Sequence, residues 1–153
     1  MNKKLTTLTA VIVLGTVAYG AESAMAGDME QAQEYRQGVM NVFRWNIKAM
    51  SGMMKGKRPY DAKAFAGYAN DLAKATTLDL MPGFPEDSDS GDDTDARPDI
   101  WLDFDDFKQK FEDLRSASRN LSEVAAGGDK TAMGEALDRA GKACKACHDK
   151  YKD

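Results

Sequence analysis

The sequence has few thiol and imidazole groups, which bind metals such as zinc and haem iron, because its 153 residues include two cysteines and one histidine. These residues, Cys144, Cys147 and His148, lie together near the C-terminus. One such cluster argues against a structural zinc site, which needs four ligands and usually draws them from two separate pairs. A disulfide between residues three apart on a helical turn has unfavourable geometry. A thioredoxin-like redox pair belongs to a βαβ pattern, and no strand pattern occurs here.

The sequence also lacks a surplus of basic residues, since its formal net charge is −4, which argues against a nucleic-acid partner. Its longest mostly apolar segment, residues 5–20, is short for a membrane span. Two lysines precede this segment and Ala24-Met25-Ala26 follows it, which is the pattern of a secretory signal peptide. We expect residues 1–26 to be a cleaved signal peptide rather than an uncleaved membrane anchor. Residues 27–153 then form one exported domain without a membrane segment.

The spacing Cys144-x-x-Cys147-His148 is the attachment signature of a c-type haem. Each thiol can add across one haem vinyl group to form a thioether, and the neighbouring imidazole can reach the iron from one face. On a helix, positions i, i+3 and i+4 share one side, so the three side chains can act together. The motif predicts one covalent haem c per chain, bound by Cys144 and Cys147, with His148 as an axial ligand of the iron.

Four segments carry apolar residues at helical spacing and are separated by turn residues, which predicts an all-α fold. The first runs from about residue 29 to residue 54, and the second runs from a cap at Asp61 to about Leu80. Asp103 and Asp129 can cap the third and the fourth. Two short links and one longer crossing connection predict an antiparallel four-helix bundle.

The fourth segment carries both cysteines on the face that holds its apolar residues. This face comprises Met133, Leu137, Ala140, Cys144, Cys147 and Tyr151. Because an apolar face points into the bundle, we expect the haem to be buried in the bundle core. The first segment has a similar face that includes Arg36, and a guanidinium there needs an acceptor such as a haem propionate.

The crossing connection, residues 82–102, is rich in aspartate and glutamate. It lacks the EF-hand order of calcium ligands, so we expect a solvated acidic loop rather than a calcium site. We expect Ile100 and Trp101 to pack the end of this connection against the bundle.

Four further stretches point to a family: Tyr35-Arg36-Gln37-Gly38, Lys55-Gly56-Lys57, Asp95-Ala96-Arg97-Pro98-Asp99-Ile100-Trp101, and Gly141-Lys142-Ala143-Cys144-Lys145-Ala146-Cys147-His148-Asp149. With them, the sequence resembles cytochrome c′, the class II c-type cytochromes, over nearly the whole predicted mature domain. Mitochondrial-type cytochromes c share only the haem motif, and they carry it near the N-terminus.

The resemblance implies one haem c in a periplasmic protein, with His148 as the proximal ligand. It implies that Arg36 and Gln37 lie at the haem edge. Asp95 resembles a loop residue that touches the haem in some relatives, and a plain acidic loop residue is the alternative. Family members often have an arginine four residues after the histidine, where this sequence has Lys152. Lysine keeps the charge but lacks the planar, forked donor.

Two functions are compatible with this site. The first is binding of small gases, NO or CO, or electron transfer, or both, at a five-coordinate, high-spin haem. The alternative is a low-spin electron carrier in which Met40, one turn after Arg36 on the distal face, is the sixth ligand. A methionine at helical spacing is more often a core residue than a ligand, which favours the first. We expect no enzyme, because peroxidase chemistry needs a distal acid–base residue and the single histidine is used at the iron.

Two kinds of protein partner are expected. The resemblance implies a homodimer, and apolar residues outside the buried face of the first helix, Val42, Trp45 and Met53, suggest that it forms through the first two helices. Electron transfer would also require a redox partner, which the sequence does not identify.

Overall fold

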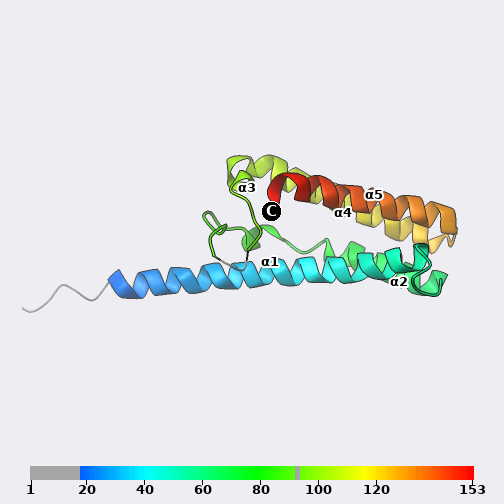
Figure 1. Ribbon diagram of the computed structural model, residues 1–153, viewed down its shortest axis with the longest axis horizontal. Helices are drawn as coiled ribbons and strands as arrows, with labels where there is room; N and C mark the ends of the chain where they lie inside the picture. Colours follow the sequence, from blue (N-terminus) through cyan, green and yellow to red (C-terminus); the bar gives the residue numbers. More distant parts are fainter. Residues whose placement is uncertain (1–17, 92–93) are drawn as a thin grey trace, which may run out of the picture.

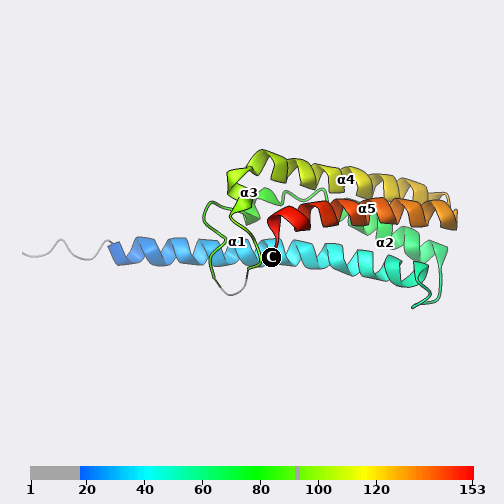
Figure 2. The same cartoon turned by 45° about the horizontal axis from the view of Figure 1, so that its top comes forward.

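The computed structural model describes residues 18–91 and 94–153 (Figure 1, Figure 2). Its helices are α1 (Ala18–Met54), α2 (Ala62–Ala75), the 3₁₀ turn η1 (Met81–Gly83), α3 (Asp99–Leu102), α4 (Phe104–Ala126) and α5 (Lys130–Tyr151). The long helices α1, α2, α4 and α5 form an antiparallel four-helix bundle, which confirms the predicted fold. Extended pairing within the described ranges is limited to one isolated bridge, Ala96 with Lys152. None of the described helices is both long and apolar enough to cross a membrane.

Three aspartates begin helices where the sequence predicts caps. The side chain of Asp61 accepts from the Ala64 amide at 2.9 Å, and that of Asp129 accepts from the Ala132 amide at 2.7 Å. Asp103 caps α4 through a longer bond to the amide of the third residue after it. Each cap satisfies a backbone donor that has no partner within the helix and contributes about 1 kcal/mol.

Two predicted helix bounds were wrong. Helix α1 begins at Ala18, not near Met29, and its first turns extend beyond the bundle in Figure 1. A formed helix extends at little cost through an alanine-rich stretch such as residues 18–26. The predicted signal peptide overlaps this stretch, and residues 1–17 lie outside the described part of the chain.

Helix α2 ends at Ala75, not near Leu80. The hydroxyls of Thr76 and Thr77 donate to the carbonyls of Ala73 and Lys74 at 2.9 and 2.7 Å, which are local bonds typical of a helix end. As a result, α2 has 14 residues, whereas α4 and α5 have 23 and 22. The segment that follows α2 runs on beside α4 without helical structure until η1 begins.

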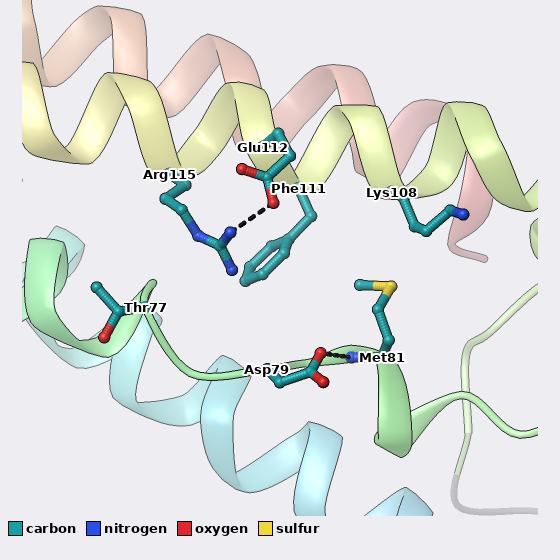
Figure 3. Close-up of a pocket in the computed structure, with 7 residues that line it drawn as sticks. All are labelled: Thr77, Asp79, Met81, Lys108, Phe111, Glu112 and Arg115. Atoms are coloured by element: carbon teal, nitrogen blue, oxygen red, sulfur yellow. Dashed lines mark hydrogen bonds and ion pairs between the residues drawn. The ribbon is translucent and has the colours of Figure 1, made fainter.

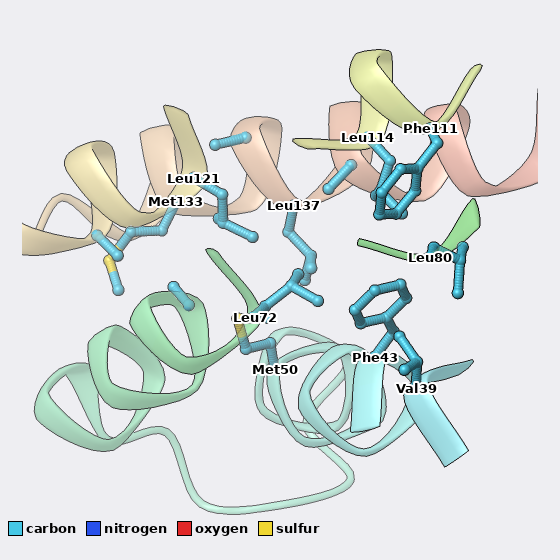
Figure 4. Close-up of a cluster of buried hydrophobic side chains, with 14 of the residues drawn as sticks. Val39, Phe43, Met50, Leu72, Leu80, Phe111, Leu114, Leu121, Met133 and Leu137 are labelled. Carbon is cyan, nitrogen blue, oxygen red and sulfur yellow. The ribbon is translucent and has the colours of Figure 1, made fainter. Parts of the chain in front are cut away.

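One end of the bundle, which we call the closed end, has a closely packed core (Figure 4). Each long helix contributes a side chain with no exposed surface: Met50, Leu72, Leu121 and Met133. Burial of such a side chain stabilises the fold by roughly 1.5–3 kcal/mol. These residues lie on the apolar faces that the sequence predicts, and all four helices are present at this end.

The crossing connection packs closely against α1. At Gly83 an added Cβ would lie 2.9 Å from the Cβ of Arg36, so only glycine permits this approach. Farther along, Ile100 is buried and the indole nitrogen of Trp101 donates to the Phe84 carbonyl at 3.3 Å. The expected packing of Ile100 and Trp101 against the body is therefore confirmed.

Candidate functional site: a cavity at the open end of the bundle

A cavity of about 550 Å³, which we call the central cavity, lies between α1, α4, α5 and the crossing connection. None of its described lining residues belongs to α2, because α2 ends before this level of the bundle. We call this level the open end. All seven site residues predicted from the sequence line the cavity: Arg36, Gln37, Met40, Asp95, Cys144, Cys147 and His148.

Helix α5 brings the two thiols and the imidazole to one wall of the cavity. Cys144 and Cys147 are half-buried, and His148 is more exposed. Burial raises the pKa of the Cys144 thiol and raises that of Cys147 to about 11. Burial also lowers the pKa of His148, and the positive charge of Lys152 lowers it further against the opposing effect of Asp149. This shift favours the neutral imidazole, which is the form that binds iron.

Helix α1 supplies an apolar wall to the same cavity. Met40 and Ile47 are half-buried there, and Phe43 between them is buried. None of these three side chains offers an N–H or O–H donor. The face on which they lie is the one predicted from the sequence.

Arg36 is buried, with 4% of its surface exposed, and its guanidinium donates to acceptors of the crossing connection. One terminal nitrogen donates to the Gly83 carbonyl at 3.0 Å and to the Ser88 hydroxyl at 2.7 Å. The other donates to the Ser88 carbonyl at 2.6 Å and to the Thr94 hydroxyl at 2.5 Å. Arg36 also lies over the ring of Phe84, 4.8 Å from its centre. It therefore holds the crossing connection in place beside the cavity.

A second residue of α1, Gln33, also holds the crossing connection. Its side-chain amide donates to the carbonyls of Ser88 and Ser90 at 3.2 and 3.0 Å.

The surroundings of Arg36 have opposite effects on its pKa. Burial lowers the pKa of Arg36, whereas the negative charge of Asp89 raises it. Gln37 is exposed at the cavity rim.

The C-terminal tail closes the rim from the other side. Lys152 forms an ion pair with Asp95, with 2.6 Å between Nζ and Oδ2, and both residues line the cavity. The backbone reinforces the contact, because the Asp153 amide donates to the Asp95 carbonyl and the Arg97 amide donates to the Tyr151 carbonyl. Asp95 is thus tied to the haem-motif helix. The sequence did not predict this ion pair, although Lys152 stands out in it as a position where family members often have an arginine.

A polar network around Tyr151 joins the start of α4 to the end of α5. The Tyr151 hydroxyl donates to Asp106 Oδ2 at 2.6 Å, and Lys150 Nζ lies 3.0 Å from the same oxygen and 2.8 Å from Asp103 Oδ2. These hydrogen bonds, from Tyr151 first and Lys150 second, hold the pKa of Asp106 at about 2. Tyr151 itself lines the cavity, so the network fixes part of the cavity wall.

A second, smaller cavity of about 330 Å³, which we call the outer pocket, lies between α4 and the segment after α2 (Figure 3). Its lining residues are Thr77, Asp79, Met81, Lys108, Phe111, Glu112 and Arg115. Phe111 also lines the central cavity, so the two spaces share one lining side chain. No motif in the sequence indicates this pocket, because it depends on where α2 ends.

The central cavity fits a haem c. Its volume falls within the range of cofactor sites, and its inner walls are apolar. Two thiols and an imidazole reach it from adjacent turns of one helix, in the arrangement that covalent attachment and axial ligation need. The fit rests on this donor set and on the hollow at the open end of an otherwise close-packed bundle.

Comparisons with known proteins agree with this site. A family model described as Cytochrome C′ matches residues 31–152. The chain is 34% identical over 128 residues to a cytochrome c′ of Halomonas halodenitrificans, across 80% of this chain and 96% of the relative. The structure resembles a cytochrome c′ from Shewanella frigidimarina with a TM-score of 0.77 and 35% identity, covering 82% of this chain and 96% of the other.

A nitric oxide complex of a mutant cytochrome c′ from Alcaligenes xylosoxidans is also similar, with a TM-score of 0.73 and 32% identity over 82% of this chain and 96% of that one. Fold and site together define a four-helix-bundle haem protein. Within that class, the chain belongs to the cytochrome c′ family and carries one covalently bound haem c. The predicted family and cofactor are thereby confirmed.

Proposed function

We propose that this chain is an exported, periplasmic cytochrome that binds small gases such as NO and CO at a five-coordinate haem iron and transfers electrons through the same haem. The observation that carries the proposal is the asymmetry of the central cavity. Its α5 wall presents Cys144, Cys147 and His148. On its α1 wall the buried and half-buried side chains, apart from Arg36, are the apolar Met40, Phe43 and Ile47, and the polar lining residues Gln37, Asn41 and Arg44 are exposed. A haem c held there supplies one redox-active iron that can take a small ligand.

Each predicted site residue around the cavity, apart from Met40, has a role in this proposal. Cys144 and Cys147 form the two thioethers, and His148 is the axial ligand. Arg36 and Gln37 lie at the haem edge, and Asp95 closes the rim through Lys152. The relative crystallised as a nitric oxide complex supports a gas ligand.

Met40 decides between the two forms of this function. In the proposed form its thioether packs as apolar bulk and slows the approach of a gas. In the alternative form it ligates the iron and makes a low-spin electron carrier. Methionine is flexible enough for both, but a half-buried methionine on an apolar helix face is more often a packing residue.

We infer that the chain is not an enzyme. General acid–base chemistry at the cavity would need a titratable group on the wall that faces the substrate. The described lining residues of α1 include no carboxyl or imidazole group, and the single histidine belongs to the α5 wall.

A homodimer through α1 and α2 is part of the proposal. Val42 and Trp45 are 46% and 66% exposed on α1, and exposed Leu78 follows α2. Met53, which was expected to join this surface, is 7% exposed and packs in the core, so that expectation was wrong. Sedimentation at high micromolar concentration should give a dimer, and Trp45→Lys should shift it toward the monomer. A monomeric wild type would contradict the dimer.

The coordination and spin state of the haem iron can be tested by absorption and electron paramagnetic resonance spectra of the ferric protein. Addition of CO to the ferrous protein tests gas binding. The proposal predicts high-spin ferric signals and CO binding, with faster CO association in Met40→Ala. The result that would contradict it is a low-spin ferric spectrum with a methionine–iron charge-transfer band that Met40→Ala abolishes. Met54→Ala, on the same helix but outside the cavity lining, is the matched control.

The compartment can be tested separately by fractionation of cells that produce the full chain. The proposal predicts haem-bearing protein in the periplasmic fraction with a new N-terminus after Ala26. Protein that keeps residues 1–26 and sediments with membranes would support the uncleaved anchor instead.

A further inference from the structure

Leu102 is the most exposed of the described large apolar side chains, with 84% of its surface exposed. The other exposed large apolar residues lie on α1 or in the segment that follows α2: Tyr35, Val42, Trp45 and Leu78. Leu102 is instead the last residue of α3, which lies at the open end of the bundle (Figure 1). A homodimer through α1 and α2 does not account for its exposure.

The aromatic residues on either side of Leu102 in the chain connect it to the central cavity. Trp101 is half-buried and donates to the carbonyl of Phe84, which lines the cavity. Phe104 is half-buried and stacks on Phe107, another lining residue, with 5.8 Å between ring centres. A short series of contacting side chains therefore leads from the surface at Leu102 to the haem site.

The chain around Leu102 is strongly acidic. Residues 86–106 hold ten of the 25 acidic residues of the sequence and one of its 21 basic residues. Eight of the ten lie in the described part of the structure: Glu86, Asp87, Asp89, Asp95, Asp99, Asp103, Asp105 and Asp106. These eight have five cationic ion-pair partners: Arg97, Lys108, Lys110, Lys150 and Lys152. Negative charge is therefore in excess at the open end, and Glu86 is exposed with no ion-pair partner among the described residues.

The closed end of the bundle has the opposite charge where α1 is joined to α2. Residues 55–63 include four basic residues and one acidic residue, Asp61, which caps α2. The four basic side chains are exposed and form no ion pair with any described residue: Lys55, Lys57, Arg58 and Lys63. The two ends thus carry charges of opposite sign.

The distance between the ends lets each act separately on an approaching protein. Helix α4 runs from one end to the other with 23 residues, which corresponds to about 35 Å. Exposed charges are screened over about 8 Å at physiological ionic strength, so a protein near one end experiences mainly the charge of that end. A cationic partner is therefore attracted to the open end and repelled from the closed end.

The mouth of the central cavity does not offer a comparable surface to an acidic partner. Two of its described lining cations, Lys110 and Lys152, are in ion pairs, and Arg36 is buried. Arg44 is exposed and donates to the side chain of Asn41 at 2.7 Å. One exposed guanidinium provides little attraction beside the carboxylates of the open end.

We propose that the open end around Leu102 is the docking surface for a redox protein with basic side chains around its own redox centre. The inference rests on the proposed electron-transfer function and names the chemistry of the partner. Leu102 provides the apolar contact and the surrounding carboxylates provide the polar rim, which is the usual anatomy of a protein interface. Transient electron-transfer complexes have small interfaces of this kind. In the complex one electron passes from ferrous haem iron to the oxidised partner, which leaves ferric iron and a partner reduced by one electron.

Stopped-flow oxidation of the ferrous haem protein by ferric mitochondrial cytochrome c, a basic redox protein, tests the charge of the surface. The second-order rate constant should fall by about tenfold or more from low to high ionic strength, because opposite charges attract the two proteins. Glu86→Lys should lower it by about threefold at low ionic strength. A rate constant that rises with ionic strength, or that Glu86→Lys leaves unchanged, would overturn the proposal.

Glu123→Lys is the matched control, because it makes the same change of charge at an exposed position in the last turn of α4, at the closed end. It should leave the rate constant nearly unchanged. Equal slowing by Glu86→Lys and Glu123→Lys would overturn the proposal, since net charge alone would then explain both.

Leu102→Ala tests the apolar contact. It should slow the reaction by about threefold, while the Tm and the haem spectrum stay at their wild-type values because so exposed a side chain contributes little to the fold. An unchanged rate constant in Leu102→Ala would contradict the assigned surface.

Carbodiimide cross-linking gives a readout that does not depend on electron transfer, because it joins carboxylates to lysines that are in contact. With mitochondrial cytochrome c, mass spectrometry should find the cross-linked carboxylates of this protein within residues 86–106. Cross-links centred on Glu123, Asp129 and Glu135 at the closed end would overturn the proposal.

Ferricyanide, a small oxidant that needs no protein interface, separates this proposal from the proposed function. A ferrous protein that ferricyanide does not oxidise would remove the electron-transfer function itself and the docking surface with it. Normal oxidation by ferricyanide, together with a reaction with mitochondrial cytochrome c that is insensitive to Glu86→Lys and Leu102→Ala, would remove the docking surface alone.

Discussion

The closed end and the open end of the bundle are built on the same helices but differ in packing. Along α5, Met133 and Ala140 have no exposed surface, whereas Cys144 and Cys147, on the same face about one and two turns after Ala140, are half-buried. The difference coincides with the end of α2 at Ala75. Four helices fill the closed end, and three helices with a crossing segment surround a cavity at the open end.

The comparison shows that a site can arise from the absence of one helix rather than from a special pattern on the other three. The faces of α1, α4 and α5 that point into the bundle continue through both ends and are mostly apolar. Where α2 stops, the crossing connection takes its place, and Arg36 holds it through backbone carbonyls and hydroxyls. The close-packed closed end therefore holds α1, α4 and α5 in position around the cavity at the open end.

Loss of the covalent haem is the largest expected effect. In Cys144→Ser combined with Cys147→Ser, acid–acetone extraction should remove any haem completely, because no thioether remains. Hydrogen exchange should then rise at the open end, while amides around Leu72 and Leu121 stay protected. Lys145→Ala, an exposed position between the two cysteines, is the control and should keep its haem. Equal loss of protection at both ends would argue against two separately packed ends.

Removal of core volume should distinguish the ends in a second way. Leu121→Ala at the closed end should lower the free energy of unfolding by about 2–5 kcal/mol, because a fully buried side chain leaves a cavity among four helices. Ile47→Ala on the half-buried wall of the open end should cost about 1–2 kcal/mol. Denaturant titration of both haem proteins gives the values, and the reverse order would contradict the comparison.

Much of this architecture follows from local patterns in the sequence. Helix faces and the caps Asp61, Asp103 and Asp129 depend on residues within a few positions of one another, so periodicity and cap chemistry predict them. The seven site residues could also be named, because six lie in the haem motif or in the stretches shared with the family, and Met40 lies one turn after Arg36 on the same helix face. All seven line one cavity.

Features that depend on distant residues could not be predicted. The partners of Arg36 at Gly83, Ser88 and Thr94 lie 47 to 58 residues away, and nothing near Arg36 indicates them. The burial of Met53 depends on packing against neighbouring helices and not on its place in the apolar pattern. The end of α2 was not predicted because threonine is also found inside helices. The hydrogen bonds from the Thr76 and Thr77 hydroxyls to the backbone carbonyls of the preceding turn are seen only in the structure.

A smaller effect is expected where the crossing connection meets α1. Gly83→Ala should destabilise the protein by about 1–3 kcal/mol, since the new methyl group would lie 2.9 Å from the Arg36 Cβ and 3.1 Å from the Tyr35 ring. Gly67→Ala on α2, where no atom lies within 4 Å, is the control and should stabilise by about 0.5–1 kcal/mol. Thermal unfolding of the two variants measures both, and a neutral Gly83→Ala would show that the connection is not held tightly.

The smallest effect concerns acid stability at the open end. The folded pKa of Asp106, about 2, lies below the unfolded value of about 3.9. Its contribution is therefore complete above about pH 4 and is lost as the pH falls through about 2. Asp106→Asn should flatten the fall in Tm across this window, and Tyr151→Phe should flatten it partly, because Tyr151 supplies the first hydrogen bond. An unchanged acid profile in both variants would contradict this assignment.

The most direct test of the account is mass spectrometry of the peptide of residues 136–153, obtained by cleavage after Glu135 with a glutamate-specific protease from the mature protein after acid–acetone treatment. The account predicts one haem on this peptide, attached through both Cys144 and Cys147. A haem-free peptide with two free thiols from correctly matured protein would contradict it.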